Sequence, residues 1–429
     1  MAAAHHFDCV VLGGGSGGIA FARRAATYGA KVALVERSRM GGTCVNVGCV
    51  PKKIMWCAAN AFESLQGMKH LGVEFSDPPR LNWQRLVQNR ENYIKRLNRI
   101  YEDNLDKSQV HRYYGFATLK PKDEANGQHV VVVNSSKEEA AKGAEPLQRL
   151  TAKHVLIATG GRPSPLRVPG GELCIDSAGF FALQQQPRKV GVVGGGYIAV
   201  ELAAVLQSLG SETHFFCRQH APLRKFDSMI QQQNLDNMRK LGIQVFPHSV
   251  PAAVKGSSGA LLLQLENGQQ HGPFECIINA TGRTPETEDL NLQTLNVEMI
   301  NQKYIKTDSF QNTNVPGIFA LGDCCGKVEL TPMAIAAGRR LADRVYGHLA
   351  HAKADYDFVP SVIFSHPPIG SVGFSEEEAA KQFGKEDLKV YNGSCVNLLY
   401  GAYQIPPEEK PKTFIKLICL KVFHFLIFF

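Results

Sequence analysis

Two cysteines five positions apart are the residues of this chain best placed to do chemistry. Cys44 and Cys49 lie in the segment Gly-Gly-Thr-Cys-Val-Asn-Val-Gly-Cys-Val-Pro-Lys-Lys. Two thiols that can join and separate carry two electrons. On an ideal helix, residues i and i+5 are about 140° apart around the axis and about 7.5 Å apart along it, which is too far for a disulfide. A bridge therefore requires the backbone to leave helical geometry, and Gly48 makes that departure easy.

A dinucleotide-binding turn lies just upstream of the two cysteines. The apolar strand 7–12 runs into a glycine-rich turn, which is followed by a helix and by a second strand that ends at Glu36. Gly13, Gly15 and Gly18 occupy the G-x-G-x-x-G positions. The glycines let the backbone approach a pyrophosphate, and Glu36 can accept a hydrogen bond from a ribose hydroxyl. Framed by strand, helix and terminal acid, this motif is a strong signal.

A second unit of the same kind begins at Lys189. Gly194, Gly196 and Ala199 fill its fingerprint positions, and its second strand is expected over 212–217. The chain therefore has two sites of the type that binds dinucleotides.

The two units differ at the end of the second strand. The position of Glu36 is taken by Cys217 in the second unit, with Arg218 adjacent and Arg224 shortly after. An acid there would repel a ribose 2′-phosphate, whereas guanidinium groups fork onto phosphate oxygens, so the second unit is expected to prefer NADPH over NADH. The alternative is that the arginines are ordinary surface residues of a loop.

The rest of the chain supplies the elements that position these motifs. Asp323 follows a strand and is expected to bond a ribityl or phosphate-linked hydroxyl. The expected elements are a helix over 82–107, a strand over 130–134, a polar loop over 135–145, a tight turn over 155–161 followed by a proline-rich linker, a strand, turn and helix start over 313–323, a helix over 331–346, a strand over 359–364 and a helix opened by a capping box at 375–378.

Composition narrows the function classes. The 429 residues are 44% hydrophobic and 20% charged, which is typical of a soluble globular protein of two to four domains. The net charge of +8 favours acidic small molecules, but no compact basic run is interleaved with aromatics, so nucleic-acid binding is not expected. Eleven scattered cysteines form neither a disulfide framework nor a zinc-site spacing. The apolar end, 418–429, is too short to span a bilayer, and with no targeting segment the expected compartment is the cytoplasm, a mitochondrial form requiring a longer N-terminus.

Taken together, the dithiol segment, both fingerprints, the Ala158-Thr159-Gly160 turn and the Gly322-Asp323 pair resemble the pyridine nucleotide-disulfide oxidoreductases. The likeness is greatest to the members that reduce glutathione disulfide, and it extends from about Phe7 to Lys416. It implies an α/β fold with two Rossmann-like domains and a partial α+β interface domain. The implied domains are FAD-binding over 1–160 and 285–354, NADPH-binding over 161–284, and a truncated interface domain with an aberrant apolar tail over 355–429.

The resemblance also implies roles for individual residues. Cys49 corresponds to the thiol next to FAD and Cys44 to the thiol that attacks the substrate, while Lys52 and Glu201 correspond to an ion pair beside the flavin ring. The implied FAD contacts are the Gly13–Gly18 turn, Glu36, Thr43, Cys44, Lys52 and Asp323, the implied NADPH contacts are Gly194, Gly196, Tyr197, Arg218 and Arg224, and Ser16, Thr159, Gly160, Ile198, Glu201, Gly282 and Thr331 complete the cofactor-binding set; no metal is implied. In the family, a tyrosine like Tyr197 shields the flavin until nicotinamide arrives.

The implied substrate is glutathione disulfide, contacted by Ser16, Arg23, Tyr101 and Arg339. Arg23 suits the anionic carboxylates of this substrate, whereas the enzyme for trypanothione, a more cationic disulfide, carries an acid and a tryptophan in this helix. Arg218 and Arg224 argue against the NAD-preferring lipoamide enzyme, and the C-terminal redox pair of animal thioredoxin reductases is absent.

The acid–base group of the family is missing from this sequence. Family members carry a histidine in a His-Pro-Thr or His-Pro-Ser motif, which reaches the active site from the partner subunit. The only His-Pro here is His366-Pro367, which corresponds to an interface-domain strand. The expectation is a truncated splice product or faulty gene model that has lost about half of the interface domain, with its tail replacing one strand as the alternative.

Two functional hypotheses follow from this missing group. The first is a glutathione-disulfide reductase with impaired turnover. The second is an FAD- and NADPH-binding chain with diaphorase-like activity, with no disulfide reductase activity, or acting on another small disulfide. The family is homodimeric, a state expected to be compromised in this chain.

Overall fold

The computed structural model describes residues 5–421, which divide into two compact units. The first unit contains the residues up to 51 together with 91–163 and 283–356, and the second contains 52–90, 164–282 and the residues from 357 onward. Two long helices contribute residues to both units, α3 (Cys49–Gly67) and α4 (Trp83–Lys107). The amphipathic pattern predicted a helix over 82–107, and α4 confirms it.

The first unit is built on a seven-stranded sheet of order β3-β2-β1-β6-β5-β4, with β18 pairing with β6. Its strands are β1 (His5–Leu12), β2 (Val32–Glu36), β3 (His111–Tyr114), β4 (Phe116–Lys120), β5 (His129–Asn134), β6 (Gln148–Ile157) and β18 (Ile318–Ala320). The strands β1, β2 and β6 are parallel neighbours. Strands buried on both faces require continuous apolar runs, and the end of β1 and all of β5 are buried. The carboxyl ends of β1, β2 and β6 share one edge, where ligands bind in open α/β sheets.

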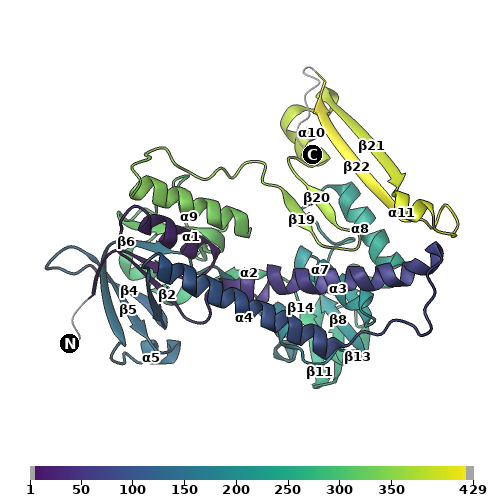
Figure 1. Ribbon diagram of the computed structural model, residues 1–429, viewed down its shortest axis with the longest axis horizontal. Helices are drawn as coiled ribbons and strands as arrows, with labels where there is room; N and C mark the ends of the chain where they lie inside the picture. Colours follow the sequence, from purple (N-terminus) through teal and green to yellow (C-terminus); the bar gives the residue numbers. More distant parts are fainter. Residues whose placement is uncertain (1–4, 422–429) are drawn as a thin grey trace. The chain divides into compact units, whose positions relative to one another are not determined.

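Helices complete the first unit (Figure 1). They are α1 (Ser16–Ala26), α2 (Gly42–Val47), α5 (Lys137–Ala141) and α9 (Thr331–Val345). Two short two-stranded sheets are formed by β7 (Gly161–Pro163) with β15 (Arg283–Pro285) and by β16 (Met299–Ile300) with β17 (Tyr304–Ile305). The 3-10 turns are η3 (Glu288–Leu290), η4 (Leu292–Leu295) and η5 (Gly322–Cys325). The backbones of α1 and α9 nearly touch, because a Cβ on Gly338 would lie 2.5 Å from the carbonyl oxygen of Gly17.

One predicted loop is wrong. The polar segment 135–145 contains α5, whose first turn is capped by Ser136 accepting the backbone N–H of Glu139. Polar composition hid a local cap that is sufficient to form a short helix.

The second unit contains a parallel sheet of order β10-β9-β8-β14. Its strands and the helices between them are β8 (Lys189–Val193), α7 (Tyr197–Ser208), β9 (Glu212–Phe216), α8 (Ser228–Lys240), β10 (Gln244–Phe246) and β14 (Cys276–Asn279). A separate antiparallel sheet contains β11 (Pro251–Ser257), β12 (Ala260–Leu265) and β13 (Gln270–Phe274). The unit also contains η1 (Met68–Leu71), η2 (Gly171–Leu173) and α6 (Ser177–Ala182). The predicted second βαβ unit is β8–α7–β9. Its second strand ends at Phe216, one residue before the predicted end.

The C-terminal part of the second unit forms two hairpins, two α-helices and a 3-10 turn. The elements are β19 (Ser361–Ile363), β20 (Ile369–Ser371), α10 (Glu376–Phe383), η6 (Lys385–Asp387), β21 (Leu388–Val396), α11 (Leu398–Gly401) and β22 (Lys412–Leu420). The predicted capping box is present, with Ser375 and Glu378 each bonding the other's backbone N–H.

The start of the apolar tail pairs as a strand. Residues 412–420 pair antiparallel with 388–396, the hairpin visible in yellow in Figure 1. Ile418 packs into a small core with Ala379 and Leu388. For residues 417–420, the alternative interpretation of a pairing strand is therefore correct, while the predicted tail from 422 onward lies outside the described residues.

A single carboxylate joins α8 to two elements of this C-terminal part, α10 and β22. Asp227 caps α8 by accepting the N–H of Met229 at 2.9 Å, and it also accepts the N–H of Glu376 at the start of α10 at 2.9 Å. Lys416 of β22 places its ammonium 2.8 Å from Asp227 Oδ1 and 2.7 Å from Glu376 Oε2. Burial raises the pKa of Asp227, but the Lys416 ammonium and the two backbone amides outweigh burial and leave the pKa below its ordinary value.

Candidate active site

The two cysteines of the dithiol segment lie at a break between two helices. Cys44 is in α2, Cys49 begins α3, and Gly48 between them has φ −147° and ψ −114°. A Cβ on Gly48 would lie 3.0 Å from the carbonyl oxygen of Thr43. The backbone thus leaves helical geometry at the residue that the sequence indicated.

This break brings the two thiols together. Neither cysteine is in a disulfide, and the Cys44 and Cys49 thiols are in hydrogen-bonding contact. The hydroxyl of Thr331 at the start of α9 lies 3.8 Å from Cys49 Sγ. Contact with Cys49, and then burial, raise the pKa of Cys44 above its usual range, while the Thr331 hydroxyl opposes this shift. Two adjacent thiols of unequal exposure can act as a dithiol–disulfide couple.

Two asparagines that the sequence analysis did not select hold this segment. Asn46 is buried, and its amide donates to the carbonyls of Met40 at 3.2 Å and Gly42 at 2.9 Å. Asn98 of α4 donates to Met40 O at 2.8 Å and to Asn46 Oδ1 at 2.9 Å. The signal available in the sequence was a single polar residue, Asn46, between two valines in the segment that joins the cysteines.

Of the predicted substrate contacts, Tyr101 is close enough to Cys44 to feel its charge. Burial raises the pKa of Tyr101 in α4, and the nearby charge of Cys44 adds to that effect while the charge of Arg23 opposes it. The exposed Arg23 also contacts Ser108 through Nε at 3.4 Å. Ser16 lies at the start of α1, and Arg339 is exposed on α9.

The first glycine turn combines tight packing with one open position. Gly13 has φ +111°, and a Cβ on Gly18 would lie 2.0 Å from the carbonyl oxygen of Gly13. By contrast, a Cβ on Gly15 would meet only Gly42 Cα, at 3.9 Å. Gly15 is also the N-cap of α1 and offers no side-chain cap to the first N–H groups. Packing requires Gly13 and Gly18, whereas Gly15 leaves room for a phosphate at the helix N-terminus.

Glu36 and Asp323 lie at the edge expected of a dinucleotide site. Glu36 accepts the N–H of Gly14 at 2.7 Å through Oε2 and that of Ser38 at 2.8 Å through Oε1. Each carboxylate oxygen keeps a lone pair for a ribose hydroxyl. Burial raises the pKa of Asp323, and Arg283, 3.8 Å away, only partly offsets this. A raised pKa suits a group that awaits hydrogen-bond donors from a ligand.

Glu286, which sequence reasoning missed, links the loops at this edge. Its carboxylate pairs with Arg37 at 2.8 Å and with Arg162 at 2.9 Å, and its carbonyl accepts the Thr159 hydroxyl at 2.6 Å. Burial raises the pKa of Glu286, but the two guanidinium groups outweigh burial and lower it. These partners are too far apart in the sequence to reveal the network.

The second glycine turn, in the other unit, is more open. A Cβ on Gly196 would meet no atom within 4 Å, and Tyr197 at the start of α7 is 43% exposed. The loop after β9 folds back onto this turn, because the N–H of Leu223 donates to Gly195 O at 2.7 Å. Arg218 and Arg224 are both exposed in that loop. The remaining predicted residues of this region are Gly194, which precedes the turn's open position, Ile198 in α7 and Gly282, which is exposed after β14.

Lys52 and Glu201 form a largely buried ion pair. Lys52 Nζ lies 2.8 Å from Glu201 Oε1, and the side chains are 12% and 6% exposed. The same oxygen accepts the backbone N–H of Phe364 at 2.9 Å. The predicted pairing of Lys52 with Glu201 is therefore present.

His366 occupies a buried position. Its Nδ1 lies 3.0 Å from Glu63 Oε2, and Glu63 also accepts the Ser208 hydroxyl. Nε2 has no hydrogen-bond partner within the part of the chain that the structure describes. A ring held in this way is suited to packing, as the sequence context indicated.

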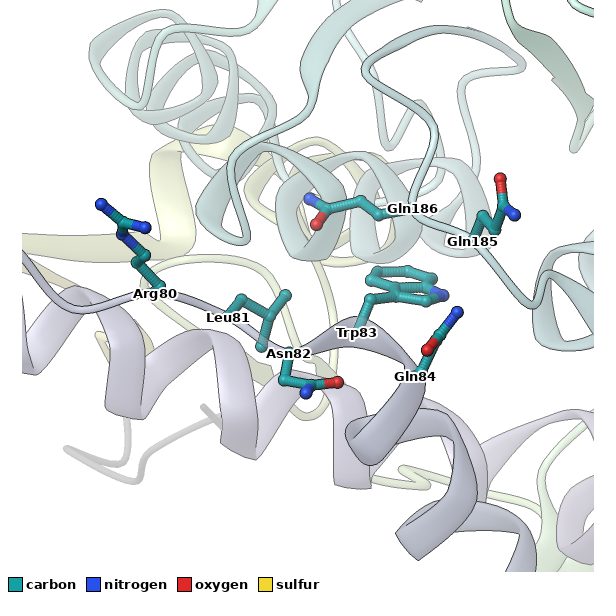
Figure 2. Close-up of a pocket in the computed structure, with 7 residues that line it drawn as sticks. All are labelled: Arg80, Leu81, Asn82, Trp83, Gln84, Gln185 and Gln186. Atoms are coloured by element: carbon teal, nitrogen blue, oxygen red, sulfur yellow. The ribbon is translucent and has the colours of Figure 1, made fainter.

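A groove of about 470 Å³ lies elsewhere in the chain, and no residue of the dithiol segment lines it (Figure 2). It lies at the start of α4 and is lined by Arg80, Leu81, Asn82, Trp83, Gln84, Gln185 and Gln186. The indole N–H of Trp83 donates to Leu183 O at 3.3 Å, and the Gln186 amide donates to Leu209 O at 2.8 Å. These polar groups serve the fold, and none of the predicted redox residues lines the groove.

Over residues 5–421, no cluster of three or more His, Cys, Asp or Glu side chains is arranged to hold a metal ion. Within the same range, no helix has the length and apolarity needed to cross a membrane.

Comparisons with known proteins identify the family. The family model of pyridine nucleotide-disulphide oxidoreductases matches residues 7–338, and that of their dimerisation domain matches residues 359–425. The chain therefore belongs to the pyridine nucleotide-disulphide oxidoreductases, as its motifs predicted. The dimerisation match extends past Lys416, where the sequence analysis placed the end of the resemblance, so that boundary is corrected.

Two relatives are similar over almost the whole chain. A glutathione reductase of Yarrowia lipolytica is 44% identical over 427 residues, which are 98% of this chain and 88% of the relative. A glutathione reductase of Schizosaccharomyces pombe is 44% identical over 417 residues, which are 96% of this chain and 87% of the relative. The predicted α/β class with Rossmann-like regions and the predicted cofactors, FAD and NADPH, are confirmed.

Proposed function

We propose that this chain uses NADPH to reduce glutathione disulfide, through FAD and the Cys44–Cys49 pair. The observation that carries the proposal is the contact of the two thiols at the break between α2 and α3. The two relatives named glutathione reductase support the choice of substrate.

The thiols account for the chemistry as follows. Bound FAD would supply the route for two electrons from NADPH, and with these electrons the Cys44–Cys49 disulfide would open to two thiols. The Cys44 thiolate then attacks one sulfur of glutathione disulfide, and one glutathione leaves as a thiolate. The Cys49 thiolate attacks Cys44 of the mixed disulfide, which restores the protein disulfide and releases the second glutathione. Two protons taken up by the leaving thiolates complete the balance.

The reaction requires that Cys44 lose its proton before it attacks the substrate. Its raised pKa disfavours the thiolate, so attack requires a base that accepts the Cys44 proton. In our proposal, Cys49 is the thiol next to FAD and Cys44 is the one that meets the substrate.

Residues of the chain fit the substrate and each of the two cofactors. Arg23 and Tyr101, together with Ser16 and Arg339, are proposed to contact glutathione disulfide, whose carboxylates suit arginine. The open position at Gly15, the acid Glu36 and the buried Asp323 are proposed to hold FAD. The open position at Gly196 and the exposed Arg218 and Arg224 are proposed to hold NADPH and its 2′-phosphate.

The test is a stopped-flow and steady-state assay of the purified chain loaded with FAD. We expect NADPH to reduce the flavin, and two thiols to appear per NADPH with glutathione disulfide but not with trypanothione or lipoamide disulfide. Cys44→Ser should abolish thiol release while NADPH still reduces the flavin. Arg218→Ala with Arg224→Ala should raise KM for NADPH at least tenfold and leave KM for NADH unchanged. Thiol release that persists in Cys44→Ser would contradict the proposal.

A second candidate has a specific observation in its favour. None of the 429 residues forms a His-Pro-Thr or His-Pro-Ser sequence, and His366 is buried against Glu63. A chain that binds both cofactors and lacks an acid–base group would reduce dyes or quinones with NADPH but release glutathione slowly. Equal rates with and without glutathione disulfide, alongside fast dye reduction, would favour this diaphorase-like function.

We further propose a homodimer located in the cytoplasm, with FAD held by the first unit and NADPH by the second. The match to the dimerisation domain supports the dimer. Native mass determination tests the assembly, and cell fractionation tests the compartment.

A further inference from the structure

Phe364 contacts both partners of the Lys52–Glu201 ion pair. Its backbone N–H donates to Glu201 Oε1 at 2.9 Å, and its ring centroid lies 3.9 Å from Lys52 Nζ. An ammonium within about 6 Å of an aromatic centroid is attracted to the ring face, most strongly when it is withdrawn from water. The ammonium of Lys52 is thus held by a carboxylate and by an aromatic ring from separate elements.

The ring is itself fixed by α3. The indole N–H of Trp56 donates to Ser365 O at 3.1 Å, and the Trp56 and Phe364 rings meet edge to face at 5.6 Å. Lys53 Nζ lies 3.9 Å from the Phe364 centroid and 3.6 Å from that of Trp56. Two ammonium groups therefore share one ring, which offsets some of the repulsion between neighbouring lysines.

The segment that carries Phe364 lies within the match to the dimerisation domain, 359–425. It is outside both dinucleotide-binding turns, yet it supplies two of the contacts that place the Lys52 ammonium.

We propose that Phe364 is a positioning residue, which fixes the Lys52 ammonium on Glu201 and thereby tunes the reduction potential of the bound flavin. The second clause rests on the proposed function and on the position beside the flavin ring that the family resemblance implies for Lys52, three residues after Cys49 on α3. A fixed positive charge favours the added negative charge of the reduced cofactor, so a Lys52 freed from the ring would make reduction harder.

The experiment compares Phe364→Leu with Phe364→Tyr in the full chain. Leucine removes the ring and keeps the backbone N–H, whereas tyrosine keeps the ring face. The matched control is Phe358→Leu, because Phe358 is half exposed in the same unit and its ring meets that of Phe374 instead. Two readouts are taken, the rate at which an acylating reagent modifies Lys52, measured by mass spectrometry, and the two-electron reduction potential of bound FAD.

We expect Phe364→Leu to raise the Lys52 acylation rate about tenfold. We expect the reduction equilibrium constant to fall by about the same factor, which is about 30 mV for a two-electron couple. Phe364→Tyr and Phe358→Leu should resemble the parent chain in both readouts, and thermal unfolding should show that all variants fold.

Each outcome decides the inference. An unchanged acylation rate in Phe364→Leu overturns it whether or not FAD binds, and so does a raised acylation rate with an unchanged potential. If the chain binds no FAD but acylation rises as expected, Phe364 still positions Lys52, and the proposed function is what fails.

Discussion

Replacing Asp227 by asparagine tests the clamp that joins α8, α10 and β22. Asparagine keeps one acceptor oxygen but loses the charge, and its NH₂ group must face either a helix N–H or the Lys416 ammonium. Hydrogen bonds to a charged group contribute about 1.5–3 kcal/mol each, and breaking a buried pair costs about 3–5 kcal/mol. Because Lys416 keeps the half-exposed Glu376 as a partner, we expect the free energy of unfolding to fall by about 3 kcal/mol.

The assay is urea unfolding of Asp227→Asn beside Asp236→Asn, a control on the same helix whose carboxylate accepts the Gln232 amide at 3.0 Å. The control should change stability by less than about 0.5 kcal/mol. The same small change in Asp227→Asn would refute the reasoning, because it would mean that the three contacts contribute nothing net.

The pH dependence of this difference has a definite sign. The pKa of Asp227 is lower in the folded chain than in the unfolded one, so the folded chain gives up this proton more readily. The stabilisation is therefore fully present above the unfolded pKa of about 3.9 and is lost as the pH falls through the folded value. We expect the gap between the parent chain and Asp227→Asn to be constant near neutral pH and to close in acid below about pH 4.

Other variants separate the roles of individual residues. Gly18→Ala places a Cβ 2.0 Å from the Gly13 carbonyl oxygen, so we expect a lower Tm and loss of FAD binding in a thermal-shift and fluorescence titration. Gly196→Ala meets no neighbour within 4 Å, so we expect an unchanged Tm and at least tenfold weaker NADPH binding by calorimetry; a lower Tm would show that packing requires this glycine. Glu286→Gln, which loses pairs with two arginines, should lower the free energy of unfolding by about 1–3 kcal/mol, whereas Glu288→Gln, at an exposed pair with Arg162 alone, should change it by less than about 1 kcal/mol.

Local patterns in the sequence were sufficient to predict several of the elements that carry the site. The helix break at Gly48 followed from helix geometry and disulfide reach, and α4 followed from its apolar spacing. The capping box at Ser375 is a four-residue signal, and it too is present. These features depend on residues close in the sequence, where spacing alone specifies the geometry.

Features that depend on distant partners could not be predicted. Ile418 is buried because β22 pairs with a strand about thirty residues earlier, so an apolar tail and a pairing strand look alike in the sequence. The Arg37–Glu286 pair joins residues 249 positions apart. The contact of Phe364 with Glu201 spans 163 positions, and neither residue carries a local mark of it.

The position of the two cysteines at adjoining helix ends has a consequence for repeated turnover. Both α2 and α3 are formed while the two cysteines are not joined by a disulfide. A bond between them closes only the short loop 44–49, and the entropy that a cross-link removes from the unfolded chain grows with the logarithm of loop length. Forming or breaking this bond therefore adds or removes no long-range cross-link. We expect the free energy of unfolding, which is small in proteins, to differ little between the oxidised and the reduced chain.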